Sequence, residues 1–128
     1  MAIIMSIQDL GIEGKWSIME ARQAGILARQ GETIIEIEGE NFRRITSKQI
    51  YERKMTLNAS SSPKTIDLLI TNEPGRGELM LGIYEISGDK LSICHSQPGR
   101  PRPQVFSSNR ENGHVLSISQ KVVGTLLL

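Results

Sequence analysis

The stretch ELMLGIYEISGDKLSICHS, residues 78–96, decides the fold. Apolar side chains recur through its first half, from Glu78 to Ile86, and again through its second half, from Lys90 to Ser96. Between the two halves stand Ser-Gly-Asp at residues 87–89, and the glycine supplies the positive φ that a tight hairpin turn requires. Residues 78–96 are therefore predicted to form a β-hairpin.

The same rhythm of a short alternating run followed by turn residues continues on both sides of this hairpin. The further runs predicted as strands are residues 15–23, 33–38, 42–46, 49–57, 64–71, 104–108 and 114–122. Together they make about eight to nine strands, which is a number that closes a small barrel. The sequence thus predicts an all-β protein, a small antiparallel up-and-down barrel of about eight strands, as one domain over residues 1–128.

A shared alternation phase within each strand predicts which side chains form the core. Because aromatic residues make up only 4% of the chain, aliphatic side chains must supply most of this core. The predicted core residues are Trp16, Ile35, Ile37, Phe42, Ile66, Leu68, Ile70, Leu91, Ile93, Phe106, Leu116 and Ile118.

One segment competes with the strand prediction. Alanine recurs through residues 17–29, which favours helix, but Gly25 and Gly31 count against a long one. We expect a loop or one short helical turn near residues 24–30, covering one end of the barrel.

The charge balance and the chain ends restrict the partners. With 15 basic and 14 acidic residues the net charge is +1, so the chain lacks the basic excess that nucleic-acid binding needs. The apolar runs at residues 2–5 and 122–128 are far shorter than the about 20 residues that span a bilayer. We therefore predict a cytoplasmic protein with no nucleic-acid partner and no membrane insertion.

Three ordered segments resemble a known family. They are SPKTIDL at residues 62–68, LGIYEISGDKLSIC at residues 81–94 and PGRPRPQVFS at residues 98–107. Together with Gly14-Lys15-Trp16, they resemble an uncharacterised lipocalin-like domain family best known from planctomycete genomes. The resemblance spans about residues 10–122, and it implies a bacterial protein with a lipocalin-like barrel.

The resemblance also implies how the two barrel ends differ. In lipocalins a Gly-x-Trp element opens the first strand and its Trp caps the closed end, a role that falls here to Gly14 and Trp16. Lipocalins usually place an Arg of the last strand over that Trp, and the nearest candidate in this chain is Lys121. Their barrels hold small apolar ligands, which is an analogy of fold and not yet of function.

Polar residues in the interior phase mark the candidate ligand site. Tyr51 and Arg53 share the phase of Met55 and Leu57. A buried Arg needs a carboxylate or a ligand anion, so Arg53 is a candidate anion-binding group. The alternative, a register shift that turns Arg53 outward, is favoured because long charged side chains rarely stay fully buried.

The two histidines are the other candidate ligand-binding residues. His95 continues the phase of Leu91 and Ile93, and His114 continues that of Leu116 and Ile118. Both are predicted to face the cavity near the barrel mouth. A metal site needs three or more ligands, and no third ligand with a recognisable spacing appears, so we predict two unrelated rim histidines and no metal.

No other motif indicates a catalytic residue or a cofactor. Cys94 and His95 are neighbours on one predicted strand and point to opposite faces, which prevents a dyad. The lone Cys94 also excludes an intrachain disulfide. The loop at residues 98–103 (PGRPRP) has the spacing of a polyproline ligand, but within the resembling family it connects two strands rigidly.

Three classes of function fit these observations. The first is a non-enzymatic barrel that binds a small amphipathic or apolar ligand, with an anionic head as our best guess. The second is a protein-interaction module, such as an inhibitor, immunity or accessory domain, that uses the barrel rim or outer face. An enzyme is a distant third, since it needs polar groups that converge inside the barrel. Neither the oligomeric state nor the identity of a ligand follows from the sequence.

Overall fold

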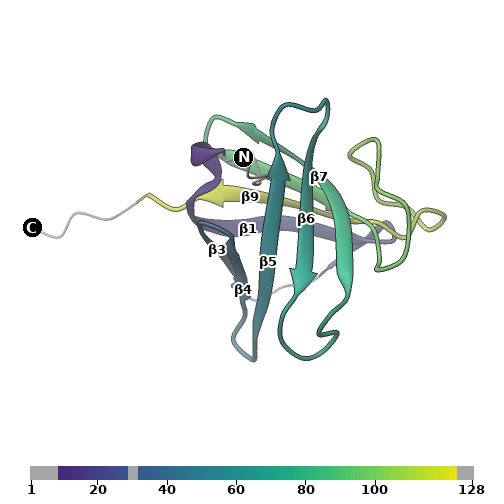
Figure 1. The fold of residues 1–128 in the computed structure, drawn as a ribbon, viewed down its shortest axis with the longest axis horizontal. Coiled ribbons are helices and arrows are strands. Elements are labelled where there is room, and N and C mark those ends of the chain that lie inside the picture. Colours follow the sequence, from purple (N-terminus) through teal and green to yellow (C-terminus); the bar gives the residue numbers. More distant parts are fainter. Residues whose placement is uncertain (1–8, 29–31, 124–128) are drawn as a thin grey trace, which may run out of the picture.

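Eight antiparallel strands close into a barrel in the computed structural model of the chain, which describes residues 9–28 and 32–123 (Figure 1). Each barrel strand pairs with the next, and the last returns to pair with the first, so that no sheet edge is left along the barrel. The barrel strands are β1 (Gly14–Gln23), β3 (Ile34–Glu38), β4 (Asn41–Ile45), β5 (Ile50–Asn58), β6 (Lys64–Ile70), β7 (Leu79–Ser87), β8 (Lys90–His95) and β9 (Val115–Lys121).

Two small elements complete the described chain. The 3-10 turn η1 (Leu10–Ile12) precedes β1, and the two-residue strand β2 (Ile26–Leu27) pairs with the end of β1. The predicted all-β barrel is confirmed. Among the described residues no helix is long and apolar enough to cross a membrane.

The hairpin at residues 78–96 forms as predicted. β7 and β8 pair in register from Ser87 opposite Lys90 to Gly82 opposite His95. Gly88 adopts a φ of 62°, which is the left-handed conformation that the turn requires.

The register aims one continuous set of apolar side chains into the barrel. Nine of the predicted core residues belong to it: Trp16, Ile35, Ile37, Phe42, Ile66, Leu68, Ile70, Leu91 and Ile93. Met55 and Leu57 of β5 join them, as do Met80 and Tyr84 of β7. Burial of this aliphatic set is the main stabilising contribution to the fold.

Three predicted core residues lie elsewhere. In β9, Ser117 pairs with Ile93 and Ser119 with Leu91, so the serines point inward while Leu116 and Ile118 point outward. The phase prediction failed because the outer face is also covered there: Leu116 lies opposite the fully buried Cys94. Phe106 is half-buried in a bent segment, and residues 104–108 form no strand.

β1 continues past Ile18 to Gln23, which matches the strand predicted at residues 15–23. A register shift between Ile18 and Glu20 leaves Met19 66% exposed and moves the inward phase to Ala21. The strand then turns at Ala24, where φ is 51°. Of the loop or short helical turn expected near residues 24–30, the described part is a turn at residues 24–25 followed by β2 and contains no helix, and residues 29 and 30 lie outside the described residues.

Antiparallel connectivity gives the barrel two different ends. The short turns after β3, β5 and β7 lie at the same end as η1. The connections after β4, β6 and β8, the last of which comprises residues 96–114, lie at the other end. In Figure 1 the turn after β5 is at the top and the loop after β6 is at the bottom. We call the end with η1 the closed end and the opposite end the open end.

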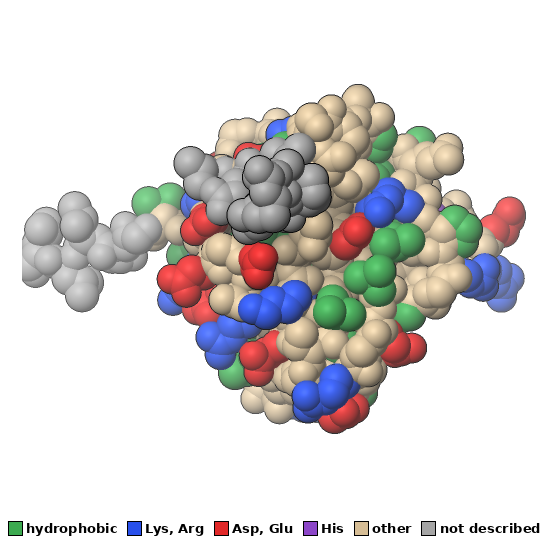
Figure 2. Space-filling model, viewed as in Figure 1, with side chains coloured by type: hydrophobic (Ala, Val, Ile, Leu, Met, Phe, Trp, Pro, Cys, Tyr) green, Lys and Arg blue, Asp and Glu red, His purple; other side chains and the backbone are tan. Residues whose placement is uncertain are grey.

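The outer face carries both charged and hydrophobic side chains on the side seen in Figure 2. Figure 2 shows charged side chains of both signs interspersed over the visible face, with hydrophobic side chains gathered over part of β6 and β7. Leu69 and Leu79, which pair across these two strands, are 40% and 43% exposed.

Candidate functional site

Trp16 fills the closed end. Its side chain is fully buried, and its Nε1 donates a hydrogen bond to the Ile12 carbonyl at 2.8 Å. Lys121 Nζ lies 4.8 Å from the centre of the Trp16 ring and donates to the Glu13 carbonyl at 2.6 Å. A Cβ at Gly14 would meet Lys121 Nζ at 3.2 Å, so this glycine leaves room for the lysine.

Asp9 fastens η1 to the barrel at the same end. One of its carboxylate oxygens accepts hydrogen bonds from Lys64 Nζ and from the Tyr84 hydroxyl, each at 3.0 Å. Burial alone would raise the pKa of Asp9, but these two hydrogen bonds together hold it below its ordinary value of 3.8. Burial first, and then the bond to Asp9, raises the pKa of the Tyr84 hydroxyl.

A cavity of about 280 Å³ occupies the open end of the barrel. Its wall is mostly apolar and includes Ile35, Phe42, Leu68, Met80 and Ile93. The charged and polar groups in the wall are fewer and come from several strands; they include Arg44, Arg53, His95 and Ser117. An apolar wall with a few placed polar groups is the usual composition of a small-molecule site.

Two guanidinium groups lie at this cavity on neighbouring strands. Arg44 of β4 is paired with Tyr51 of β5, and its Cζ lies 4.1 Å from the centre of the tyrosine ring. Arg53, two residues further along β5, places its Cζ 5.7 Å from the same ring. Arg53 Nη1 also donates to the Glu52 carbonyl at 2.9 Å.

Neither guanidinium has a carboxylate partner among the described residues. Burial lowers the pKa of Arg44, although the adjacent Tyr51 raises it again. Burial also lowers the pKa of Arg53, and the positive charge of Arg44 lowers it further. Both side chains still carry their charge at neutral pH, because an arginine is not deprotonated in proteins.

His95 adds a neutral polar group to the same cavity. Its Nδ1 lies 3.1 Å from the Ser96 carbonyl oxygen. Since a carbonyl only accepts, Nδ1 carries the proton and Nε2 keeps a lone pair. Burial is the main cause that lowers the pKa of His95, and the charges of Arg53 and Arg44 lower it further.

Gly82 makes room for His95 on the paired strand. The two residues are opposite each other, and a Cβ at Gly82 would lie 2.9 Å from the Cys94 carbonyl oxygen and 3.0 Å from His95 Cβ. A larger residue at position 82 must therefore displace the β7–β8 backbone or the histidine.

The structure brings together three of the four predicted ligand residues. Tyr51, Arg53 and His95 gather at the open end, so the favoured alternative of an outward Arg53 is wrong. His114 precedes β9 in the same outward phase as Leu116 and does not line the cavity.

Sequence reasoning missed Arg44. The signal was present, because Arg44 shares the alternation phase of the predicted core residue Phe42, two positions earlier on the same strand.

Cys94 lies on the opposite side of β8 from this cavity. Its thiol donates to the Ser107 carbonyl at 3.4 Å, beneath the long connection between β8 and β9. Burial raises the pKa of Cys94, which keeps it a thiol rather than a reactive thiolate. Cys94 and His95 thus form no dyad, as predicted from their spacing.

The same connection is fixed to the outer face of the barrel. Arg102 Nη1 donates to Asp67 at 2.6 Å and to the Gly82 carbonyl at 2.8 Å, and Pro103 is buried. The Ser96 hydroxyl donates to the Arg100 carbonyl at 3.2 Å. The second half of the PGRPRP segment therefore packs on the barrel and is not an exposed polyproline ligand.

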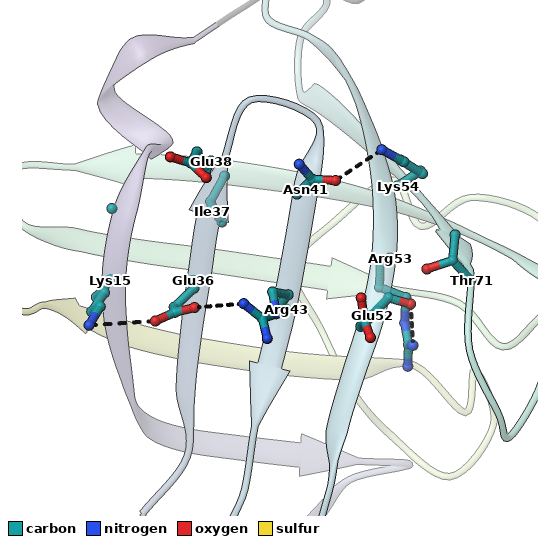
Figure 3. A pocket seen from close by; sticks show the side chains of 11 residues that line it. Lys15, Glu36, Ile37, Glu38, Asn41, Arg43, Glu52, Arg53, Lys54 and Thr71 are labelled. Carbon is teal, nitrogen blue, oxygen red and sulfur yellow. Dashed lines mark hydrogen bonds and ion pairs between the residues drawn. The ribbon is translucent and has the colours of Figure 1, made fainter.

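A wider hollow of about 590 Å³ lies on the outer face of the barrel, and Figure 3 shows its lining. Glu36 there is paired with both Lys15 and Arg43, each at 3.5 Å, and Lys54 donates to Asn41 at 2.9 Å. Lys15 and Arg43 thus share the carboxylate of Glu36, and Lys54 binds a neutral amide. Arg53 lines this hollow as well as the internal cavity. The smaller internal cavity is the candidate site because Arg44 and Arg53, which both line it, have no carboxylate partner among the described residues.

Comparison with known proteins adds no further evidence. No protein-family model, no curated protein and no solved structure matches the chain. Among the described residues, no group of three or more His, Cys, Asp or Glu side chains is placed to hold a metal ion. The function must be argued from the geometry of the barrel.

Proposed function

We propose that the chain is a non-enzymatic binding protein that holds a small amphipathic molecule in the open-end cavity of its barrel. The observation that carries this proposal is the cavity itself, with an apolar wall and cationic groups in one location. Such a wall takes up an apolar body by the hydrophobic effect, and its polar groups fix the orientation of the ligand. The resemblance to planctomycete lipocalin-like domains agrees with this proposal, which does not depend on it.

The cavity volume sets the size of the ligand. One water occupies about 30 Å³ in the liquid, so about 280 Å³ corresponds to roughly nine non-hydrogen atoms. A long-chain lipid exceeds this volume, whereas octanol or octanoate matches it. The best test ligands are therefore eight-carbon amphipaths.

Isothermal titration of the purified chain with 1-octanol and with octanoate tests the proposal. We expect saturable binding with one site per chain for at least one of the two. Ser117→Phe, which fills the cavity from an inward position on β9, is expected to abolish it. Ser92→Phe, on the outward face of the neighbouring strand, is the matched control and leaves binding unchanged. Binding that survives in Ser117→Phe would place the ligand elsewhere.

A protein-interaction module is the second candidate, and one observation favours it. A hollow of about 580 Å³ on the outer face is lined by Leu79, Leu81 and the loop from Pro98 to Pro101. Exposed apolar area of this kind is typical of protein contacts. Leu79→Glu separates the two functions, because it changes this surface and leaves the internal cavity intact. The interaction module would be favoured if Leu79→Glu abolished binding of a protein partner and the unmodified chain bound no small molecule.

A further inference from the structure

We propose that Arg44 and Arg53 form an anion subsite across the Tyr51 ring, so that the ligand of the barrel is an anionic amphipath with a short apolar tail. This inference rests on the proposed function and deepens it, because it assigns the charge of the head group and the residues that bind it. It also adds Arg44, which lies on β4 beside Tyr51 and Arg53, the two β5 residues that alternation had placed on the inner face.

The first argument is the cost of two desolvated cations without a counter-charge. Arg44 and Arg53 are half-buried, neighbour each other across β4 and β5, and have no carboxylate partner among the described residues. The Tyr51 ring offsets part of this cost through its contacts with both guanidiniums. A bound anion would offset the rest, because charge-assisted hydrogen bonds are strongest where water is excluded.

The second argument is the contrast with neighbouring residues on the same strands. Arg43 and Lys54 stand next to Arg44 and Arg53, but they point outward and bind Glu36 and Asn41 respectively. Partners for cations are thus present on the outer face of these strands and missing on the inner face. The inner cations are the ones placed beside an apolar cavity.

The third argument concerns donor geometry. Arg53 uses one N–H for the Glu52 carbonyl, and Arg44 forms a side-chain hydrogen bond with Tyr51. A guanidinium carries five N–H donors, so each arginine keeps further donors for a ligand. A guanidinium presents its donors as a planar fork that matches the oxygens of a carboxylate, sulfonate or phosphate. The shared chemistry is an oxyanion head, with the tail directed toward Phe42, Leu68 and Met80.

His95 makes the affinity of this subsite for an anion depend on pH. Its Nε2 keeps a lone pair. The charges of Arg53 and Arg44 in the same cavity, and of His114 on the outward face, disfavour protonation of His95. The strands paired with it there contribute only Gly82 and Val115. An anion bound by the arginines offsets part of their positive charge, so that binding raises the pKa of His95 and affinity rises as the pH falls.

The test compares eight-carbon ligands that differ only in the head group. Octanesulfonate stays anionic at every pH used, octanoate is anionic at neutral pH, and 1-octanol is neutral. In isothermal titrations at pH 7.5 we expect Arg44→Met and Arg53→Met each to raise the Kd of both anions by about 10- to 100-fold. The Kd of 1-octanol should stay within about threefold. Arg43→Met and Lys54→Met are the matched outward controls and leave every Kd unchanged.

Two outcomes separate this inference from the proposed function. If 1-octanol binds in the cavity and neither anion depends on Arg44 or Arg53, the anion subsite is overturned while the binding barrel stands. If none of the three ligands binds, the proposed function itself fails. If an arginine variant unfolds, an NMR titration of the unmodified chain with octanesulfonate replaces it. We expect the side-chain Nε–H signals of two arginines to shift, and the absence of such a shift would overturn the subsite.

A separate series of titrations tests whether His95 makes the affinity depend on pH. Octanesulfonate should bind more tightly as the pH falls from 8 to 5, by about tenfold for each unit by which binding raises the pKa of His95. His95→Gln should remove this dependence, and His114→Gln should keep it. A pH-independent affinity in the unmodified chain would overturn the role of His95.

Discussion

The two ends of the barrel treat their charged groups in opposite ways. At the closed end Lys121 covers the Trp16 ring and binds a carbonyl, and Asp9 joins Lys64 to Tyr84. At the open end Arg44, Arg53 and His95 share a cavity without a carboxylate among the described residues. At the closed end the polar groups bind one another within the chain and stabilise the fold. At the open end the two arginines have no ionic partner within the described chain and can bind a ligand.

Substitution of Trp16 should have the largest effect, because it removes the centre of the closed end. Trp16→Ala deletes a fully buried aromatic side chain, its hydrogen bond to Ile12 and its contact with Lys121. We expect the free energy of unfolding to fall by about 3–5 kcal/mol. Urea unfolding followed by circular dichroism measures it. Met19→Ala, at the exposed bulge of the same strand, is the control and should cost less than about 0.5 kcal/mol.

Gly82→Ala probes the open end through its backbone. The added methyl group would lie 2.9 Å from the Cys94 carbonyl oxygen, so the strands must move apart or His95 must shift. We expect a loss of about 1–3 kcal/mol in urea unfolding, together with a changed NMR chemical shift of the His95 ring. Gly11→Ala, whose new methyl group meets Ile86 at an ordinary 3.6 Å, is the control. If both variants behave alike, the close approach at Gly82 has no consequence.

The ionised Asp9 should make the stabilising contribution of the closed end depend on pH. The folded chain holds the pKa of Asp9 below 3.8, so its contribution is present in full above that value and is lost as the pH falls through the folded-state pKa. Asp9→Asn should therefore cost about 1 kcal/mol at pH 7, a figure kept low because Lys64 is partly exposed. In acid, the stabilities of the variant and the unmodified chain should converge. A constant difference down to pH 2 would contradict the ionic role of Asp9, and Glu111→Gln serves as an exposed control.

Much of this contrast could be predicted from alternation, but only where one face of a strand is covered. The predicted phases of β5 and β8 were correct, and they place Tyr51, Arg53 and His95 inward. In β9 both faces are covered, the inner by the barrel and the outer by residues 96–114, so alternation of Leu, Ile and Ser does not reveal which side is inside.

Other features depend on long-range packing. The register shift at Met19 and the docking of Arg102 on Asp67 have no local signal in the sequence. Arg44 is different, because it shares the alternation phase of Phe42 and so has a local signal that the sequence analysis did not use. The apolar frame of the candidate site was therefore predictable, whereas Arg53 was identified as a candidate but favoured outward, and Arg44 was not identified.

The smallest expected change in the free energy of unfolding is a gain instead of a loss. It tests the difference between the two barrel ends most directly. In the ligand-free chain, Arg44→Met and Arg53→Met each replace a desolvated, unpaired cation by an apolar side chain of similar length. We expect the free energy of unfolding to stay the same or to rise by about 0.5 kcal/mol, because the lost ring contact is offset by removing the cost of burying a charge. Arg43→Met, which breaks the pair with Glu36 on the outer face, should instead lose up to about 1 kcal/mol.

Losses of about 2 kcal/mol or more in both inner variants would show that the open end uses its arginines for stability, as the closed end uses Lys121 and Asp9. The expected gain has the reverse meaning. A side chain whose removal stabilises a protein is there for another reason, and at this position the chemistry available to a guanidinium is the binding of an anion.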